Sequence, residues 1–125
     1  MKILIAIILM VLAGACFADP GDYRLTKEDD AMIELALNDR CQTFKDISDG
    51  AGRSDAEGEY IKTMCILIAR IGVYQRFDDL RAIPYQVALK NVLAKSTDSA
   101  TIKLNTLGIV AGSAVAKAYL GMNAE

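Results

Sequence analysis

The sequence predicts an all-α protein, a small four-helix bundle with one disulfide that follows an N-terminal signal peptide. Two observations support this fold class. Apolar residues recur at spacings of three and four along four segments, as in helices with one buried face. No segment shows the strict alternation of apolar and polar residues that is typical of strands. We assign residues 1–18 to the signal peptide and residues 19–125 to a single helical domain.

The first residues have the pattern of a secretory leader. A short positive start, Met1-Lys2, precedes an apolar stretch and then a run of small residues. The apolar stretch is too short to span a bilayer, so we expect cleavage after Ala18, release into the periplasm and no transmembrane helix in the mature chain. In the alternative interpretation Cys16 is lipidated, although Ala13 stands where bacterial lipoproteins usually have Leu.

Two helices are predicted in the first half of the mature chain. The first begins near Thr26, whose hydroxyl can cap it ahead of three acidic residues, and ends between Arg40 and Lys45. Residues 46–53 contain two Gly, two Asp and a Ser and are predicted to form an exposed loop. The apolar stripe of the first helix comprises Met32, Leu35 and Ala36, widened by Ile33 and Leu37.

The second helix is predicted over residues 55–77, because Ser54 and Glu57 can form a capping box ahead of a strong apolar pattern. It is the expected centre of the core. A third helix has Pro84 in its first turn and ends within residues 95–99. A fourth covers residues 100–120, with Gly121 as its C-terminal stop. The apolar face of the second helix comprises Ile61, Met64, Cys65, Ile68, Ile71 and Gly72.

The composition excludes several classes of function. The chain has no His, which removes the Ser-His-Asp and Cys-His arrangements and the commonest metal ligand. Its net charge is −2 and it has no clustered basic run, so we expect no nucleic-acid partner. The acidic clusters are explained by helix starts and solvated surface rather than by paired glycosidase carboxylates. We therefore predict a protein that is not an enzyme and uses no metal or cofactor.

Two cysteines remain once the leader is removed. An even pair in an exported protein predicts a disulfide between Cys41 and Cys65, which stand on the first two helices. A redox-active or metal-binding pair and two free thiols are the alternatives.

Two further groups of residues are predicted to pack helices together. Gly108 and Gly112 have the spacing that lets helices approach closely, either a neighbouring helix or a second copy in a homodimer. Tyr60, Leu67 and Tyr74 follow one another at seven-residue steps, as in a buried or dimer-facing seam.

The order of features carries a family resemblance. A signal peptide precedes a helix that ends in a Cys and then a Gly-rich loop. There follow Cys65-Ile66-Leu67-Ile68-Ala69-Arg70-Ile71-Gly72-Val73-Tyr74, a Pro-initiated helix at Ile83-Pro84-Tyr85-Gln86, and a small-residue helix ending in Ala118-Tyr119. Over roughly residues 35–119 this resembles the Rap1a/Tai family of type VI secretion amidase immunity proteins. Both cysteines of that family's second disulfide are missing here.

The resemblance implies a periplasmic immunity protein that binds and inhibits a peptidoglycan amidase effector without catalysing a reaction. By motif, only the disulfide cysteines carry over. The alternative function is a small periplasmic acid-stress or holding chaperone, or a cell-envelope binding protein. We predict the partner-binding surface from exposure and polarity, in the loop (Asp46, Asp49, Arg53) and at the corner after the second helix (Asp78, Asp79, Arg81).

Overall fold

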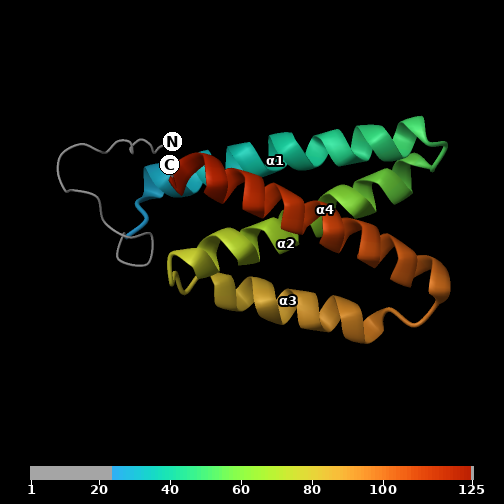
Figure 1. The fold of residues 1–125 in the computed structure, drawn as a ribbon. Coiled ribbons are helices and arrows are strands. Elements are labelled where there is room, and N and C mark those ends of the chain that lie inside the picture. The colour runs from blue at the N-terminus through green and yellow to red at the C-terminus, as the bar shows by residue number, and fades with distance from the viewer. Residues whose placement is uncertain (1–23, 125) are drawn as a thin grey trace.

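The computed structural model describes residues 24–124, with side chains described as far as Gly121, so the predicted signal peptide lies outside the described residues. Figure 1 shows four helices: α1 (Lys27–Gly50), α2 (Asp55–Arg76), α3 (Ala82–Lys95) and α4 (Ser99–Ala124). The described part of the chain contains no strand, which confirms the all-α prediction. None of these helices is long and apolar enough to cross a bilayer.

The central helix is α2, which packs against each of the other three. α1 and α3 run antiparallel to it, and α4 crosses it in the parallel direction (Figure 1). Small residues make the α2–α4 crossing close, because a side-chain carbon added at any of the three glycines would overlap its neighbour. The successive contacts are Gly108 with Met64, Gly112 with Ile68, and Gly72 with Ala116.

The first two helices begin where the sequence predicts. Thr26 accepts a hydrogen bond from the backbone N–H of Asp29, whose carboxylate accepts one in return from the N–H of Thr26. Ser54 and Glu57 form the same reciprocal pair at the start of α2. Both capping boxes satisfy N–H groups that have no partner inside the helix.

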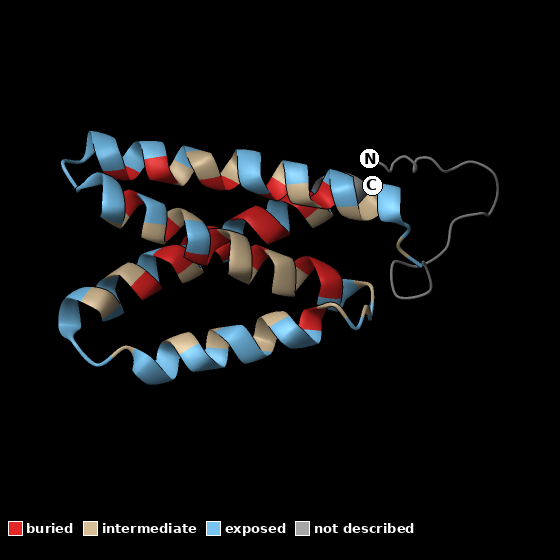
Figure 2. Ribbon diagram, turned by 180° about the vertical axis from the view of Figure 1, so that it is seen from behind, coloured by how far each residue is buried: buried red, intermediate tan, exposed pale blue. Residues whose placement is uncertain are grey.

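The core lies between α1, α2 and α4, as the buried residues in Figure 2 show. Ile33, Leu37 and Cys41 form the buried stripe of α1, at spacings of four. The predicted centre of that stripe was wrong, because Met32 and Leu35 are 50% and 73% exposed. The disulfide on Cys41 turns the Ile33 side of α1 toward α2, and Leu35 consequently points to solvent.

The predicted end of α1 is also wrong. The helix continues to Gly50, well past Lys45, and the turn comprises only residues 51–54. Lys45 and Ser48 are buried in the last turns, so packing extends the helix through residues whose local preference is for a turn.

α3 and α4 agree with their predicted positions except at the C-terminal end of α4. Pro84 is the third residue of α3, in the first turn as expected. α4 continues through Gly121 to Ala124, so Gly121 is not a stop. The reason is conformational, since Gly121 does not adopt the positive φ of a helix-terminating glycine.

Candidate functional site

The predicted disulfide is present. Cys41 and Cys65 are bonded, with their Cα atoms 5.8 Å apart, and both side chains are fully buried. The bond joins the middle of α1 to the middle of α2. It therefore holds together the two helices that carry most of the polar contacts described below.

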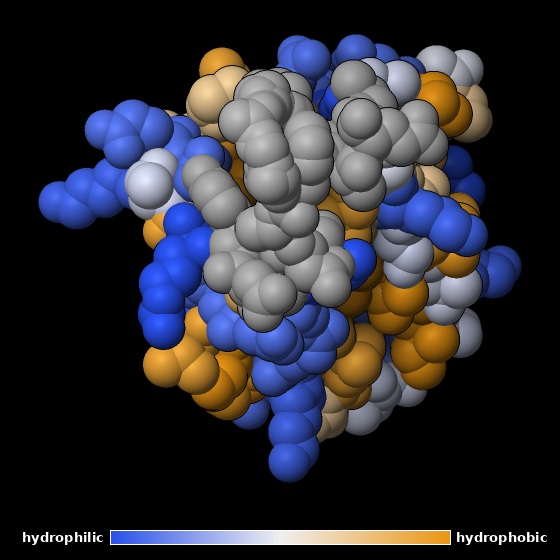
Figure 3. All heavy atoms as spheres, turned by 60° about the vertical axis from the view of Figure 1, so that its left-hand side comes forward, coloured by the Kyte–Doolittle hydropathy of each residue, from blue (hydrophilic) through white to orange (hydrophobic). Residues whose placement is uncertain are grey.

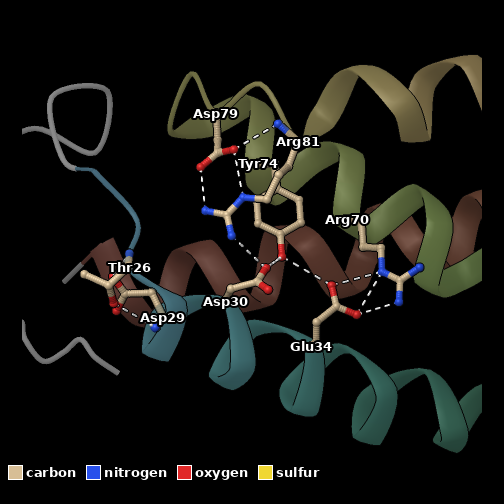
Figure 4. A network of polar contacts seen from close by, with 8 residues as sticks. All are labelled: Thr26, Asp29, Asp30, Glu34, Arg70, Tyr74, Asp79 and Arg81. Carbon is tan, nitrogen blue, oxygen red and sulfur yellow. Dashed lines mark hydrogen bonds and ion pairs between the residues drawn. The ribbon is translucent and has the colours of Figure 1, made fainter.

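The largest group of polar contacts, which we call the tyrosine cluster, joins α1 to α2 and to the corner before α3 (Figure 4). At its centre the buried Tyr74 hydroxyl donates a hydrogen bond to Asp30 and lies 3.2 Å from Oε2 of Glu34. Arg70 donates from Nε and Nη2 to Glu34, at 2.5–3.0 Å. The cluster comprises Asp30, Glu34, Arg70, Tyr74, Asp79 and Arg81.

Arg81 ties the corner into the cluster. Its guanidinium donates to both carboxylate oxygens of Asp79, at 2.9 and 2.7 Å, and lies 3.1 Å from Asp30. Its Cζ lies 5.0 Å from the ring centre of Tyr74, a cation–π contact, and Arg70 has the same relation to Tyr85. The two tyrosine rings are stacked with centres 6.0 Å apart, which links α3 to α2.

These contacts fix the protonation states in the cluster. Burial, and then the hydrogen bond to Asp30, raise the pKa of Tyr74 well above its ordinary value, so the phenol stays neutral. The hydrogen bonds from Arg81 lower the pKa of Asp79 and keep it ionised. A neutral phenol bound to carboxylates that arginines already neutralise is a poor proton donor or nucleophile at neutral pH. The arrangement is suited to holding three helices in register.

The first predicted binding segment is the tip of the α1–α2 hairpin. Asp46 is exposed and accepts a hydrogen bond from Gln42. Asp49 is exposed but pairs with Lys45, whose ammonium lies 2.7 Å from Asp49 and 2.8 Å from Asp55. Arg53 lies in the turn and is exposed.

The second predicted binding segment is the α2–α3 corner. Asp78 is exposed and has a φ of 53°, a left-handed conformation that Asp tolerates better than most residues. Asp79 and Arg81 are half-buried and belong to the tyrosine cluster. The two segments lie at opposite ends of the 22-residue helix α2, about 33 Å long. The structure therefore does not bring them together.

The chain is 50% identical over 125 residues to YffQ, an uncharacterized protein of Escherichia coli strain K12, and the match covers the whole of both chains. The chain belongs to the YffQ family. No family model and no solved structure matches it. The resemblance to the Rap1a/Tai family therefore stays a prediction.

In this member of the YffQ family, four of the five residues predicted to pack helices together make contacts within the chain. Gly108 and Gly112 contact α2 rather than an open surface. Tyr74 is fully buried, while the Tyr60 hydroxyl donates to Asn105 of α4 at 2.5 Å and Leu67 is half-buried. The five residues do not form one exposed seam.

Sequence reasoning missed the tyrosine cluster and the buried Lys45. Asp30 and Tyr74 are 44 positions apart, and no local pattern links them. A weak signal does exist in the spacing of Asp30 and Glu34, which places two carboxylates on one side of α1 next to apolar Ile33. The hydrogen bonds that Lys45 donates to Asp49 and Asp55 raise the pKa of Lys45, which keeps this buried ammonium charged. The described residues contain no group of His, Cys, Asp and Glu able to hold a metal ion.

Proposed function

We propose that this protein is an exported immunity protein that acts by binding, and that its target is a type VI secretion peptidoglycan amidase whose cleft it occludes. The single observation that carries the proposal is the shape of the α1–α2 tip. Every residue from Gly50 to Ser54 is exposed, and three of the five are Gly or Ala. A narrow tip of this kind suits entry into an enzyme cleft.

The tip is held in one conformation from several sides. Gly52 has a φ of 90°, which a residue with a side chain adopts only under strain. The Ala51 N–H donates to Ile47 and Ser48, and Lys45 connects the end of α1 to Asp55 at the start of α2. Because the tip is ordered before binding, less conformational entropy is lost when a partner binds it.

Two further features support the proposal. A disulfide in a small protein with a leader sequence is typical of an oxidising compartment, where peptidoglycan and its amidases are found. In the described residues, the largest polar cluster is closed by its own ion pairs and hydrogen bonds. The choice of an amidase as the target rests on the family resemblance.

The test is capture followed by inhibition. The oxidised protein serves as bait for envelope extracts of its source, and the captured hydrolase is assayed on purified peptidoglycan. We expect a single amidase whose activity disappears at an equimolar ratio. Recovery of no amidase, or of an amidase that remains active in the complex, contradicts the proposal.

A matched pair of variants locates the contact. Arg53→Glu changes the tip, and Arg76→Glu makes the same change at an exposed position at the other end of α2. We expect Arg53→Glu to weaken binding at least about tenfold through loss of a central contact, and Arg76→Glu to stay within about twofold. Asp78→Asn, which preserves tolerance of the positive φ, tests the corner in the same assay. Loss of binding with Asp78→Asn alone moves the contact to the corner.

The second candidate function is an acid-stress holding chaperone, and the corner favours it. The pKa of Asp79 lies below its ordinary value because Arg81 stabilises the carboxylate, so strong acid is needed to protonate it and release Arg81. That release loosens α3, which carries the exposed apolar residues Ile83 and Val87. This function predicts suppressed aggregation of unrelated proteins in strong acid and none at neutral pH, measured by light scattering.

A further inference from the structure

The outer side of α3 is apolar, and no element within residues 24–121 covers it. Leu80 just before the helix is 77% exposed, Ile83 is 52% exposed and Val87 is 53% exposed. Lys90 and Ala94 continue the same stripe at helical spacing, and both are exposed. These five residues are called the α3 face below.

The inner side of α3 is apolar as well. Tyr85, Leu89 and Val92 are half-buried on the side turned toward α2, and Ala82 is the buried residue of the helix. A helix that is apolar on both sides is typical of an interior position, yet α3 packs mainly against α2 at the edge of the bundle (Figure 1). Apolar side chains also reach the surface among polar ones on the end of the molecule that faces the viewer in Figure 3.

Charge is distributed unevenly between the two halves of the described chain. Residues 24–79 carry eight basic and twelve acidic side chains, whereas residues 80–124 carry five basic side chains and one acidic one, Asp98. Of the five, Arg81 is paired with Asp30 and Asp79. The other four are exposed, and the described residues provide no ion pair for them: Lys90, Lys95, Lys103 and Lys117.

From this combination we infer that the α3 face docks on an anionic lipid surface, with Leu80, Ile83 and Val87 entering the headgroup region and Lys90 and Lys95 of α3 contacting lipid phosphates. Apolar side chains that insert and cations that stay at the headgroups are the two components of interfacial binding by a helix. The inference does not depend on an amidase target, since the proposed contact for the amidase is the α1–α2 tip.

The distribution of charge favours lipid over other occupants. In a dimer that pairs two α3 faces, Lys90 of each copy enters the interface without a compensating carboxylate on the face, which opposes association. The four exposed lysines also belong to two helices, α3 and α4. Such spacing suits mobile lipid phosphates, which can move to each ammonium, better than the fixed carboxylates of a folded protein.

The experiment is co-sedimentation of the protein with lipid vesicles. The protein is purified from cells that export it and has its disulfide formed. One set is phosphatidylcholine alone, and the other contains about 30% phosphatidylglycerol as the anionic lipid. We expect at least about tenfold stronger binding to the anionic vesicles, and most of it lost when salt is raised from about 0.05 M to about 0.5 M.

Two double variants and two matched controls assign the contact. I83N/V87N removes apolar side chains from the α3 face, and K90E/K95E reverses the charge of Lys90 on that face and of Lys95 at the end of the same helix. The controls are Leu35→Asn and Lys27→Glu, both on α1. Leu35 is 73% exposed, and Lys27 is an exposed lysine in the acidic half of the described chain. We expect each double variant to lower binding to anionic vesicles at least about tenfold, and each control to stay within about twofold. Thermal unfolding verifies that all four proteins are folded.

Three outcomes overturn the inference. The first is equal binding to both kinds of vesicle, or an equal loss with the controls. The second is binding to soluble polyglutamate without binding to vesicles, which assigns the face to an acidic protein. The third is a dimeric mass in light scattering that I83N/V87N converts to a monomer, which assigns the face to a second copy.

Discussion

Replacement of Gly112 by Ala tests the close crossing of α2 and α4. The added side-chain carbon would lie 2.6 Å from the backbone carbonyl oxygen of Cys65 and 2.5 Å from Cβ of Ile68. Normal contacts at these atoms are about 3.4 Å or longer, so each is too short by roughly 0.8 Å. Neither atom is free to move, because Cys65 is fixed by its disulfide and Ile68 is β-branched. We therefore expect α4 to be pushed away from α2.

The magnitude follows from two opposing effects. Overpacking of a well-packed core destabilises by about 1–3 kcal/mol, and the contact with backbone places Gly112→Ala at the upper end of that range. Ala in place of Gly within a helix contributes about 1 kcal/mol in the other direction. The expected net loss is about 2 kcal/mol, which corresponds to a decrease in Tm of roughly 8–16 °C for a domain of this size.

The matched control is Gly121→Ala in the same helix. Gly121 is exposed and an added Cβ meets nothing within 4 Å, so this variant gains helix propensity without overlap. We expect its Tm to be unchanged or higher. Thermal unfolding of both variants by far-UV circular dichroism decides the question. A Gly112→Ala protein as stable as Gly121→Ala refutes the close crossing and the packing that we derive from it.

Three further predictions concern the disulfide and the tyrosine cluster. Closing a loop with a sequence separation of 24 stabilises by about 3.5 kcal/mol, so protein refolded in reductant, with Cys41 and Cys65 as thiols, is expected to unfold in urea with that much less free energy. Because the pKa of Tyr74 is raised, the folded state retains a proton that the unfolded chain loses above about pH 10, so stability falls as the pH rises past that value. Urea titrations below and above about pH 10 measure this fall in the free energy of unfolding. We expect the fall to be smaller for Tyr74→Phe, which has no phenol to titrate. The lowered pKa of Asp79 works in the opposite direction, because the stability it contributes is present above about pH 4 and is lost as the pH falls below that value. We expect Asp79→Asn to be less stable than the native protein at neutral pH. Equal stability of the variant and the native protein at pH 7 contradicts the ion pair with Arg81.

Local signals account for the helices that the sequence predicted well. The starts of α1 and α2 follow from reciprocal side-chain contacts three residues apart, and the position of Pro84 follows from its missing N–H. These interactions join residues within one turn of helix, so they can be predicted from the local sequence. The disulfide was predictable for a different reason, namely an even number of cysteines after the predicted leader.

Contacts over long separations account for the errors. α1 extends to Gly50 because Lys45 and Ser48 are buried, Lys45 against the start of α2, and this packing overrides the turn preferences of Asp46 and Asp49. In the same way, the α2–α3 corner has the composition of a solvated turn, yet Asp79 and Arg81 are bound to each other and to α1. The charges were visible in the sequence, but their pairing depends on how α1 lies across α2.

The Cys41–Cys65 bond closes a loop that contains the whole exposed α1–α2 tip. A protease that cleaves the backbone within residues 51–54 therefore does not separate the chain into two parts. The two fragments remain covalently joined, and the buried contacts between α1 and α2 persist in the cleaved molecule. Such a cut is invisible on a non-reducing gel and appears as two bands once the disulfide is reduced, so the disulfide protects the oxidised protein against loss of half its fold at this exposed turn.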